Sequence, residues 1–203
     1  MAWVTKIKSE KLYTGYEVSL VALVLTAFAS MACFVYVVNA RDSYALAVLG
    51  GLMGAGVGMG LVAGVPRVAP RLNARAVMWG VIGAVAILPL QAFIHLSASA
   101  TQFLDVSGAS VVLFAAVAEE WFFRFGLQRL LERFTNPWVA LIIQAGVFAV
   151  YHWRVYPGYD VTSVAFPMIA GLILGAVNVM AKDISASMTA HFINNLFTVI
   201  TSW

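Results

Sequence analysis

The sequence predicts an all-α protein that crosses a membrane as a polytopic bundle of about seven helices. Of its 203 residues, 62% are hydrophobic and 10% are charged, and its mean hydropathy is +0.90. Soluble domains contain roughly 45–50% apolar and about 25% charged residues. The apolar runs are continuous rather than alternating, which indicates helices and not a β-barrel. The length accommodates about six to eight spans and no separate soluble domain.

Seven apolar runs are expected to be the spans. They cover roughly residues 17–39, 44–65, 76–96, 109–128, 137–153, 163–180 and 186–202. The first run is too long for the apolar part of a cleavable signal, so we expect it to be a membrane helix. The second run carries two glycine stripes, and Gly56, Gly60 and Gly64 of one stripe allow close helix packing. In the fifth, Asn136 fits the N-cap and Pro137 the first helical position.

The basic residues outside the spans predict the orientation of the chain. With the N-terminus in the cytoplasm, nine lysines and arginines lie inside and two lie outside, which agrees with the positive-inside rule. We therefore expect a multi-pass integral membrane protein, in the cell membrane if the host is a prokaryote. The net charge is +3, and the single cysteine, Cys33, has no partner within the chain for a disulfide.

Ionisable residues inside the apolar runs carry the functional signal, because each costs at least about 2.5–3.5 kcal/mol to insert into a bilayer. Glu120 and Arg124 are four residues apart, so on a helix they face each other and can form an ion pair. Glu119 lies about 100° round the helix from Glu120. It is left to face another helix, where a carboxylate can act as a general base. The alternative is a buried ion-pair network that only fixes helix packing.

Two later motifs add histidines to the apolar runs. Phe148 and His152 share one helix face, and a neutral imidazole can help a carboxylate to polarise water. His191 and Asn195 also share a face, and both can donate hydrogen bonds to a developing oxyanion. The alternatives are a packed or interfacial histidine and interhelical hydrogen bonds without a catalytic role. For Asn194, which lies off that face, we prefer the packing interpretation.

The three motifs resemble, in type and order, those of the CPBP intramembrane protease family. The patterns are Glu-Glu-x-x-x-Arg, then Phe-x-x-x-His, then His-x-x-x-Asn, each on its own apolar helix. The family includes the Rce1-type prenyl-protein CAAX endopeptidases and the bacterial Abi proteins, some of them linked to bacteriocin immunity. The resemblance spans about residues 105–200. We expect a single membrane domain, residues 1–203, with variable N-terminal helices in 1–104 and the CPBP/Abi-like catalytic core in 105–203.

The resemblance implies a hydrolase: an intramembrane endopeptidase that cleaves a membrane-associated protein or peptide, prenylated and of the CAAX type in part of the family. It implies that Glu119 and His152 activate the attacking water. His191 and Asn195 are expected to stabilise the oxyanion. The implied supporting residues are Glu120, Arg124 and Phe148. The implied partners are a hydrophobic or lipidated substrate and membrane lipids, and no nucleic acid.

The resemblance leaves the cofactor open, because both metal-dependent and metal-free mechanisms are argued for this family. The chain has no His-Glu-x-x-His helix, the spacing typical of zinc proteases, so we expect no cofactor. The alternative is Zn²⁺ held by Glu119, His152 and His191, since a catalytic zinc takes three protein ligands. The predicted spans also put these three residues at different depths, which the 1.5 Å rise per residue does not reconcile. We therefore expect the span boundaries to shift.

Two other classes of function remain alternatives. One is a non-proteolytic membrane scaffold or bacteriocin self-immunity protein with the same fold, against which the intact motifs argue. The other is a small transporter or proton relay, because buried glutamate and histidine also mark such pathways. The sequence lacks the paired broken helices of inverted repeats that would favour a transporter.

Overall fold

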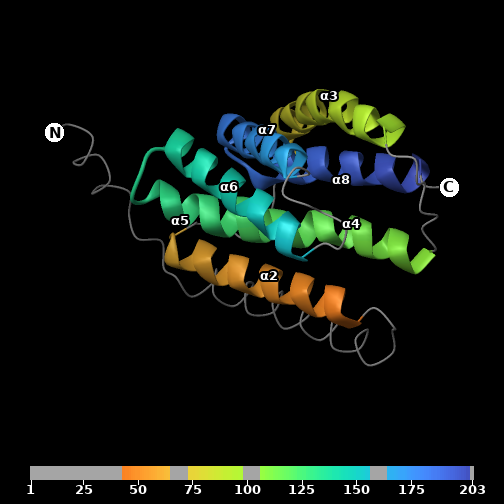
Figure 1. Ribbon diagram of the computed structural model, residues 1–203. Helices are drawn as coiled ribbons and strands as arrows, with labels where there is room; N and C mark the ends of the chain where they lie inside the picture. Colours follow the sequence, from red (N-terminus) through yellow and green to blue (C-terminus); the bar gives the residue numbers. More distant parts are fainter. Residues whose placement is uncertain (1–42, 65–72, 98–105, 156–163, 202–203) are drawn as a thin grey trace.

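The computed structural model describes residues 43–64, 73–97, 106–155 and 164–201 (Figure 1). Within these ranges the chain is helical and contains no strand, which confirms the all-α prediction. The predicted first span, residues 17–39, lies outside the described residues. The bundle of seven spans therefore stays a prediction.

The described helices follow the remaining predicted spans closely. They are α2 (Ser43–Val62), α3 (Ala74–Ser97), α4 (Val106–Glu120), η2 (Trp121–Gln128), α5 (Arg129–Glu132), α6 (Pro137–Val155), α7 (Ala165–Ala181) and α8 (Ile184–Thr201). The π-helix η2 joins α4 to α5 without a break. These three elements form one helical rod over residues 106–132, which is longer than the predicted span of 109–128.

One described stretch, Ala74–Phe93 in α3, is long and apolar enough to cross a bilayer by itself. Three shorter apolar stretches are Leu49–Leu61, Pro137–Trp153 and Ala165–Ala181. A helix needs about 20 apolar residues to span the hydrocarbon core. The multi-pass arrangement and the cytoplasmic N-terminus stay predictions.

Local capping groups fix where two of the helices begin. The Asn136 side-chain oxygen accepts two backbone N–H groups of the first turn of α6 at 3.0 Å, and Pro137 is its first residue, as predicted. At the turn between α7 and α8, α7 ends where Lys182 adopts a left-handed conformation with φ 59°. The Asp183 carboxylate then accepts the backbone N–H of Ser185 at 2.9 Å. This short turn makes α7 and α8 neighbours.

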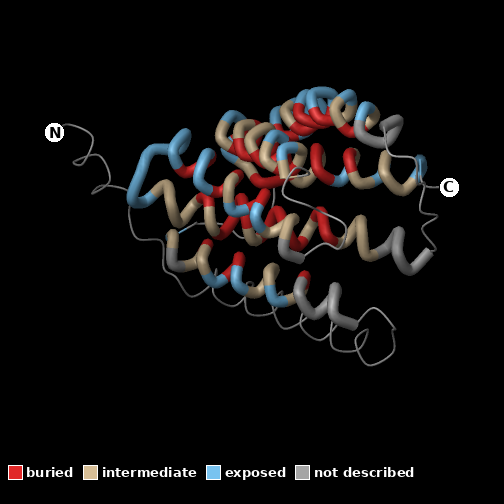
Figure 2. The backbone as a smooth tube through the Cα atoms, in the orientation of Figure 1, coloured by how far each residue is buried: buried red, intermediate tan, exposed pale blue. Residues whose placement is uncertain are grey.

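The α4–η2–α5 rod occupies the centre of the fold, with α2 on one side and α8 on another (Figure 1). The helix α3 packs on α7 and α8, and α6 packs on α7 and η2. Figure 2 shows that buried residues gather where the helices face one another, whereas exposed residues lie on the outer faces. The middle of the rod, which carries the acidic pair, is therefore enclosed by other helices.

Glycine allows α2 to touch the rod backbone to backbone. A Cβ on Gly126 would lie 2.7 Å from the Cα of Gly56, and a Cβ on Gly60 would lie 2.1 Å from the ring of Phe125. At Gly56 and Gly126 no side chain fits between the two backbones, as close packing of small residues requires. The packing prediction is confirmed for two members of the stripe. The third, Gly64, lies beyond the end of α2 with φ 67°.

Candidate active site

The acidic pair lies where the rod changes its helical geometry. Glu119 and Glu120 are the last two residues of α4, and the eight residues that follow them form the π-helix η2. Short π-helical segments inside α-helices occur frequently at functional sites. Both glutamates are at most 1% exposed. The sequence patterns did not indicate the π-helix.

Glu120 and Arg124 form the predicted ion pair. The Glu120 Oε1 atom lies 2.9 Å from Arg124 Nη1, and both side chains are fully buried. A second arginine nitrogen, Nη2, donates to the carbonyl oxygen of Gly171 on α7 at 3.4 Å. The guanidinium also lies over the ring of Phe148, 4.5 Å from its centroid, which is a cation–π geometry. Three helices therefore hold the single arginine of the site.

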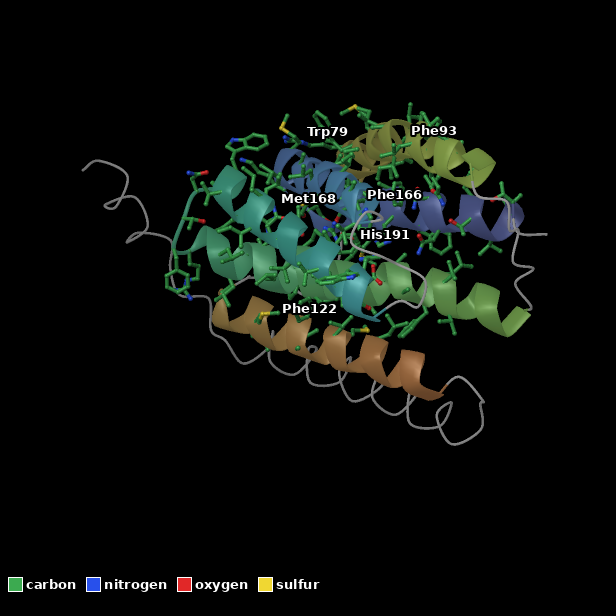
Figure 3. The ribbon with its side chains drawn as sticks, viewed as in Figure 1. Trp79, Phe93, Phe122, Phe166, Met168 and His191 are labelled. Atoms are coloured by element: carbon green, nitrogen blue, oxygen red, sulfur yellow. The ribbon has the colours of Figure 1, made fainter. Side chains whose placement is uncertain are left out.

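Glu119 lies close to both motif histidines. Its Oε2 atom is 3.8 Å from His191 Nε2 and 3.9 Å from His152 Nε2. These separations exceed a direct hydrogen bond and suit a bridging water. Figure 3 shows His191 on α8, in the interior of the bundle. The structure thus brings together one predicted residue from each of α4, α6 and α8.

The hydrogen bonds of the two histidines define which ring nitrogens carry protons. His152 Nδ1 lies 2.9 Å from the carbonyl oxygen of Phe148. That oxygen can only accept, so Nδ1 of His152 donates. His191 Nδ1 lies 2.8 Å from Glu120 Oε1, and an ionised carboxylate likewise only accepts. When neutral, both imidazoles therefore direct an unprotonated Nε2 toward the Glu119 carboxylate.

Aromatic rings surround the histidines on the side of α6. Phe148 is buried, and its centroid lies 4.3 Å from that of His152 and 6.1 Å from that of His191. Phe123 packs edge-on against Phe148, with centroids 4.9 Å apart. Such packing restricts the ring rotations of both imidazoles. Phe148, the predicted supporting residue, therefore lies next to both motif histidines.

Asn195 is placed differently from its predicted partner His191. Its Nδ2 atom donates to the carbonyl oxygen of Val112 on α4 at 2.8 Å. This bond ties α8 to α4 and occupies one of the two amide N–H groups. Asn194 is buried, and its backbone carbonyl oxygen accepts the Thr198 hydroxyl at 3.4 Å. These contacts join helices or turns, and the oxyanion role of Asn195 stays a prediction.

Three buried amides next to this cluster were missed by the sequence patterns. Gln128 and Gln144 are 0% exposed, and Asn178 is 1% exposed. A signal was present, because Gln128 lies four residues after Arg124 and Gln144 lies four residues before Phe148. At four-residue spacing these side chains share a helix face with the motif residues.

Zinc ligation was the predicted alternative for this site. Glu119, His152 and His191 are donors of the types that zinc takes, and both Nδ1 atoms have acceptors, as in metal sites. Among residues 43–64, 73–97, 106–155 and 164–201, however, no group of three His, Cys, Asp or Glu side chains has an arrangement that could hold a metal ion. Zinc ligation by these three residues stays a prediction, and the reaction proposed for the site uses only the protein's own side chains.

The geometry thus defines a buried cluster of carboxylates and imidazoles at the meeting of three helices, which is the candidate acid–base site. Residues 105–197 match the family model of the Rce1-like type II CAAX prenyl endopeptidases. The matched range contains all seven predicted site residues, and the resemblance predicted from the three motifs is confirmed. The Rce1-like family is membrane-integral, and the match supports a protease of this kind. No curated protein and no solved structure shows significant similarity to the chain.

Proposed function

We propose that the protein is an intramembrane endopeptidase in which Glu119 activates the attacking water. The observation that carries this proposal is the position of Glu119 Oε2, 3.8 Å from His191 Nε2 and 3.9 Å from His152 Nε2. A water between these atoms donates one hydrogen bond to the carboxylate and its second to an imidazole whose Nε2 is unprotonated. A positioned general base typically contributes about 10²–10⁴-fold to the rate of such a step.

The proposed reaction balances within this set of groups. Glu119 removes a proton from water, and the hydroxyl oxygen forms a bond to the carbonyl carbon of the scissile peptide. The resulting tetrahedral oxyanion is stabilised by donors held in a buried site, where each acts more strongly than in water. The proton on Glu119 then moves to the leaving nitrogen as the C–N bond breaks. No other co-reactant is required.

The oxyanion step sets a condition on His191. Its Nδ1 proton is directed at Glu120, so it donates through Nε2 only as an imidazolium. Glu120 and Arg124 then have a clear part in the step, because the carboxylate stabilises that cation and the arginine balances the carboxylate. The charges of Glu119, Glu120, Arg124 and the imidazolium sum to zero. A neutral total charge favours burial of the whole cluster.

We further propose a membrane-associated substrate that is lipidated or hydrophobic near the scissile bond. The family match supports a prenylated protein of the CAAX type as one such substrate. The positive-inside bias of the loops supports a multi-pass topology with the N-terminus in the cytoplasm. A metal-free mechanism is preferred because the chain has no His-Glu-x-x-His helix, the spacing typical of zinc proteases.

The test is cleavage of a panel of prenylated and hydrophobic peptides by purified protein in detergent. Wild type, Glu119→Ala and wild type with excess chelator are compared side by side. We expect cleavage that survives chelation and is lost in the Glu119→Ala variant. Loss under both conditions would indicate zinc. No cleavage of any peptide by wild type would contradict the protease and favour the scaffold or immunity protein.

A further inference from the structure

A second group of buried polar side chains lies beside the acid–base site and has no part in the proposed reaction. It consists of Gln128 on η2, Gln144 on α6 and Asn178 on α7, all at most 1% exposed. We refer to these three residues as the amide cluster. Neutral amides at this depth are costly to bury unless each polar atom has a partner, so their positions need an explanation.

Hydrogen bonds to α7 connect the amide cluster to the acid–base site. Gln144 Nε2 donates to the carbonyl oxygen of Gly171 at 3.0 Å, the same oxygen that accepts from Arg124 at 3.4 Å. Gln128 Nε2 donates to the carbonyl oxygen of Gly175, one turn further along α7, at 3.4 Å. The cluster thus continues the polar surface of the site along the α7 backbone.

The amide cluster also reaches the surface of the described structure. Asn178 Nδ2 donates to Gln128 Oε1 at 3.4 Å, and Gln128 Nε2 donates to Glu132 Oε1 at 3.3 Å. Glu132 is 16% exposed and pairs with Arg129, which is 26% exposed, at 2.8 Å. The rod residues Glu120, Arg124, Gln128 and Glu132 follow one another at four-residue steps. A polar face therefore runs from the acidic pair to the partly exposed end of α5.

Two acceptors in the amide cluster have no partner among the described residues. They are Gln144 Oε1 and Asn178 Oδ1, both inaccessible at the surface. Buried polar atoms in folded proteins almost always have a partner, and internal water supplies it where protein groups do not. A Cβ on Gly175 would lie 2.7 Å from Gln144 Nε2, so glycine at this position lets the Gln144 amide lie against the α7 backbone.

We propose that the amide cluster binds a short file of water molecules between Glu132 and the acidic pair. Gln144 Oε1 and Asn178 Oδ1 are the acceptors that these waters satisfy, and the carbonyl oxygens of Gly171 and Gly175 line the same path. A hydrolase enclosed by apolar helices consumes one water molecule for each bond that it cleaves. The file supplies the next water molecule to the site. That supply role rests on the proposed function, whereas water binding in the cluster does not.

Cysteine accessibility to Ag⁺ tests the water file without any cleavage assay. Cys33 is the only native cysteine, so a Cys33→Ala background gives a cysteine-free parent. Asn178→Cys reports on the file. Leu174→Cys, one turn earlier on α7 and equally buried at 1% in an apolar cluster, is the matched control. After exposure of the folded protein to Ag⁺, the protein is unfolded and the remaining thiols are labelled with a maleimide.

We expect the Asn178→Cys thiol to react at least about ten-fold faster than the Leu174→Cys thiol, because only the first faces bound water. Equal rates, or no reaction at Asn178→Cys, would overturn the proposal. Size-exclusion profiles and melting temperatures establish that both variants are folded. Because neither readout depends on catalysis, an inactive enzyme does not affect this result, and an absent water file does not affect the protease proposal.

A blocking variant tests the route itself. Gln128→Leu, added to Asn178→Cys, replaces the amide between Asn178 and Glu132 by an apolar side chain of similar size. We expect it to slow the Ag⁺ reaction by about ten-fold, since water leaves apolar sites. Gln91→Leu is the control, because Gln91 is a buried amide between α3 and α8, outside the cluster. An unchanged rate with Gln128→Leu, or equal slowing by both variants, would refute this route.

Discussion

The Nδ1 atom of His191 and the Oε1 atom of Glu120 lie 2.8 Å apart, although 71 residues separate them in the sequence. The same carboxylate oxygen faces Arg124 at 2.9 Å. Glu120 therefore joins the third motif to the first and orients the imidazole of His191. A carboxylate behind a histidine is the usual means by which proteins fix its tautomer.

The first prediction concerns that tautomer. We expect neutral His152 and His191 to carry their protons on Nδ1, because Phe148 and Glu120 present acceptors to those atoms. Nitrogen chemical shifts of protein labelled with ¹⁵N-histidine measure this directly. Assignment uses the variants His152→Gln and His191→Gln. Protonation at Nε2 of either neutral ring would contradict the arrangement around Glu119.

The second prediction separates the roles of the two acids. Glu119→Gln should lower kcat by about 10²–10⁴-fold, because it removes the general base and keeps the side chain's shape. Its melting temperature in detergent should stay close to that of wild type. Steady-state cleavage and thermal unfolding of the same preparation provide both values. A variant that cleaves at the wild-type rate would eliminate Glu119 as the base.

The third prediction is that Glu120→Ala destabilises the protein. It leaves the fully buried Arg124 without its carboxylate partner, a change that typically costs about 3–5 kcal/mol. The control is Glu132→Ala, which removes a partly exposed ion pair with Arg129 worth at most about 1 kcal/mol. Thermal unfolding in one detergent compares the two variants. Equal losses of stability would contradict a buried structural pair at Glu120.

The fourth prediction tests the glycine contact between α2 and the rod. Gly56→Ala should destabilise the fold by about 1–3 kcal/mol, because its Cβ would lie 2.2 Å from a backbone oxygen of Trp121. Gly58→Ala is the control on the same helix. Within the described ranges nothing lies within 4 Å of a Cβ at Gly58, so alanine there should be neutral or slightly stabilising. The melting temperature of the Gly56→Ala variant should therefore be lower than that of the Gly58→Ala variant.

Contacts within one helix were predictable from the sequence. The ion pair of Glu120 and Arg124 and the shared face of Phe148 and His152 follow from four-residue spacing alone. The helix ends at Asn136 and Pro137 follow from the rules of capping. In each case the geometry depends on a few neighbouring residues, and the structure agrees with the prediction.

Contacts between helices were not predictable in the same way. The bond from Asn195 to the Val112 carbonyl oxygen depends on the rotation and depth of two helices, which no single pattern defines. The predicted spans put Glu119 and the two histidines at different depths, a mismatch that we expected shifted boundaries to resolve, and in the structure the three groups converge. The predicted spans assumed an ordinary helix over 109–128, whereas the rod extends over 106–132 and contains η2.

The direct contact of Gly56 with Gly126 has a mechanical consequence. With backbone against backbone, neither helix can turn about its own axis without a steric clash, and neither can come closer. The contact of Gly56 with Gly126 therefore fixes the position of α2 against the rod. Under the proposed function, we expect a bulky peptide to enter on the flank of the rod where α6 and α7 pack on η2.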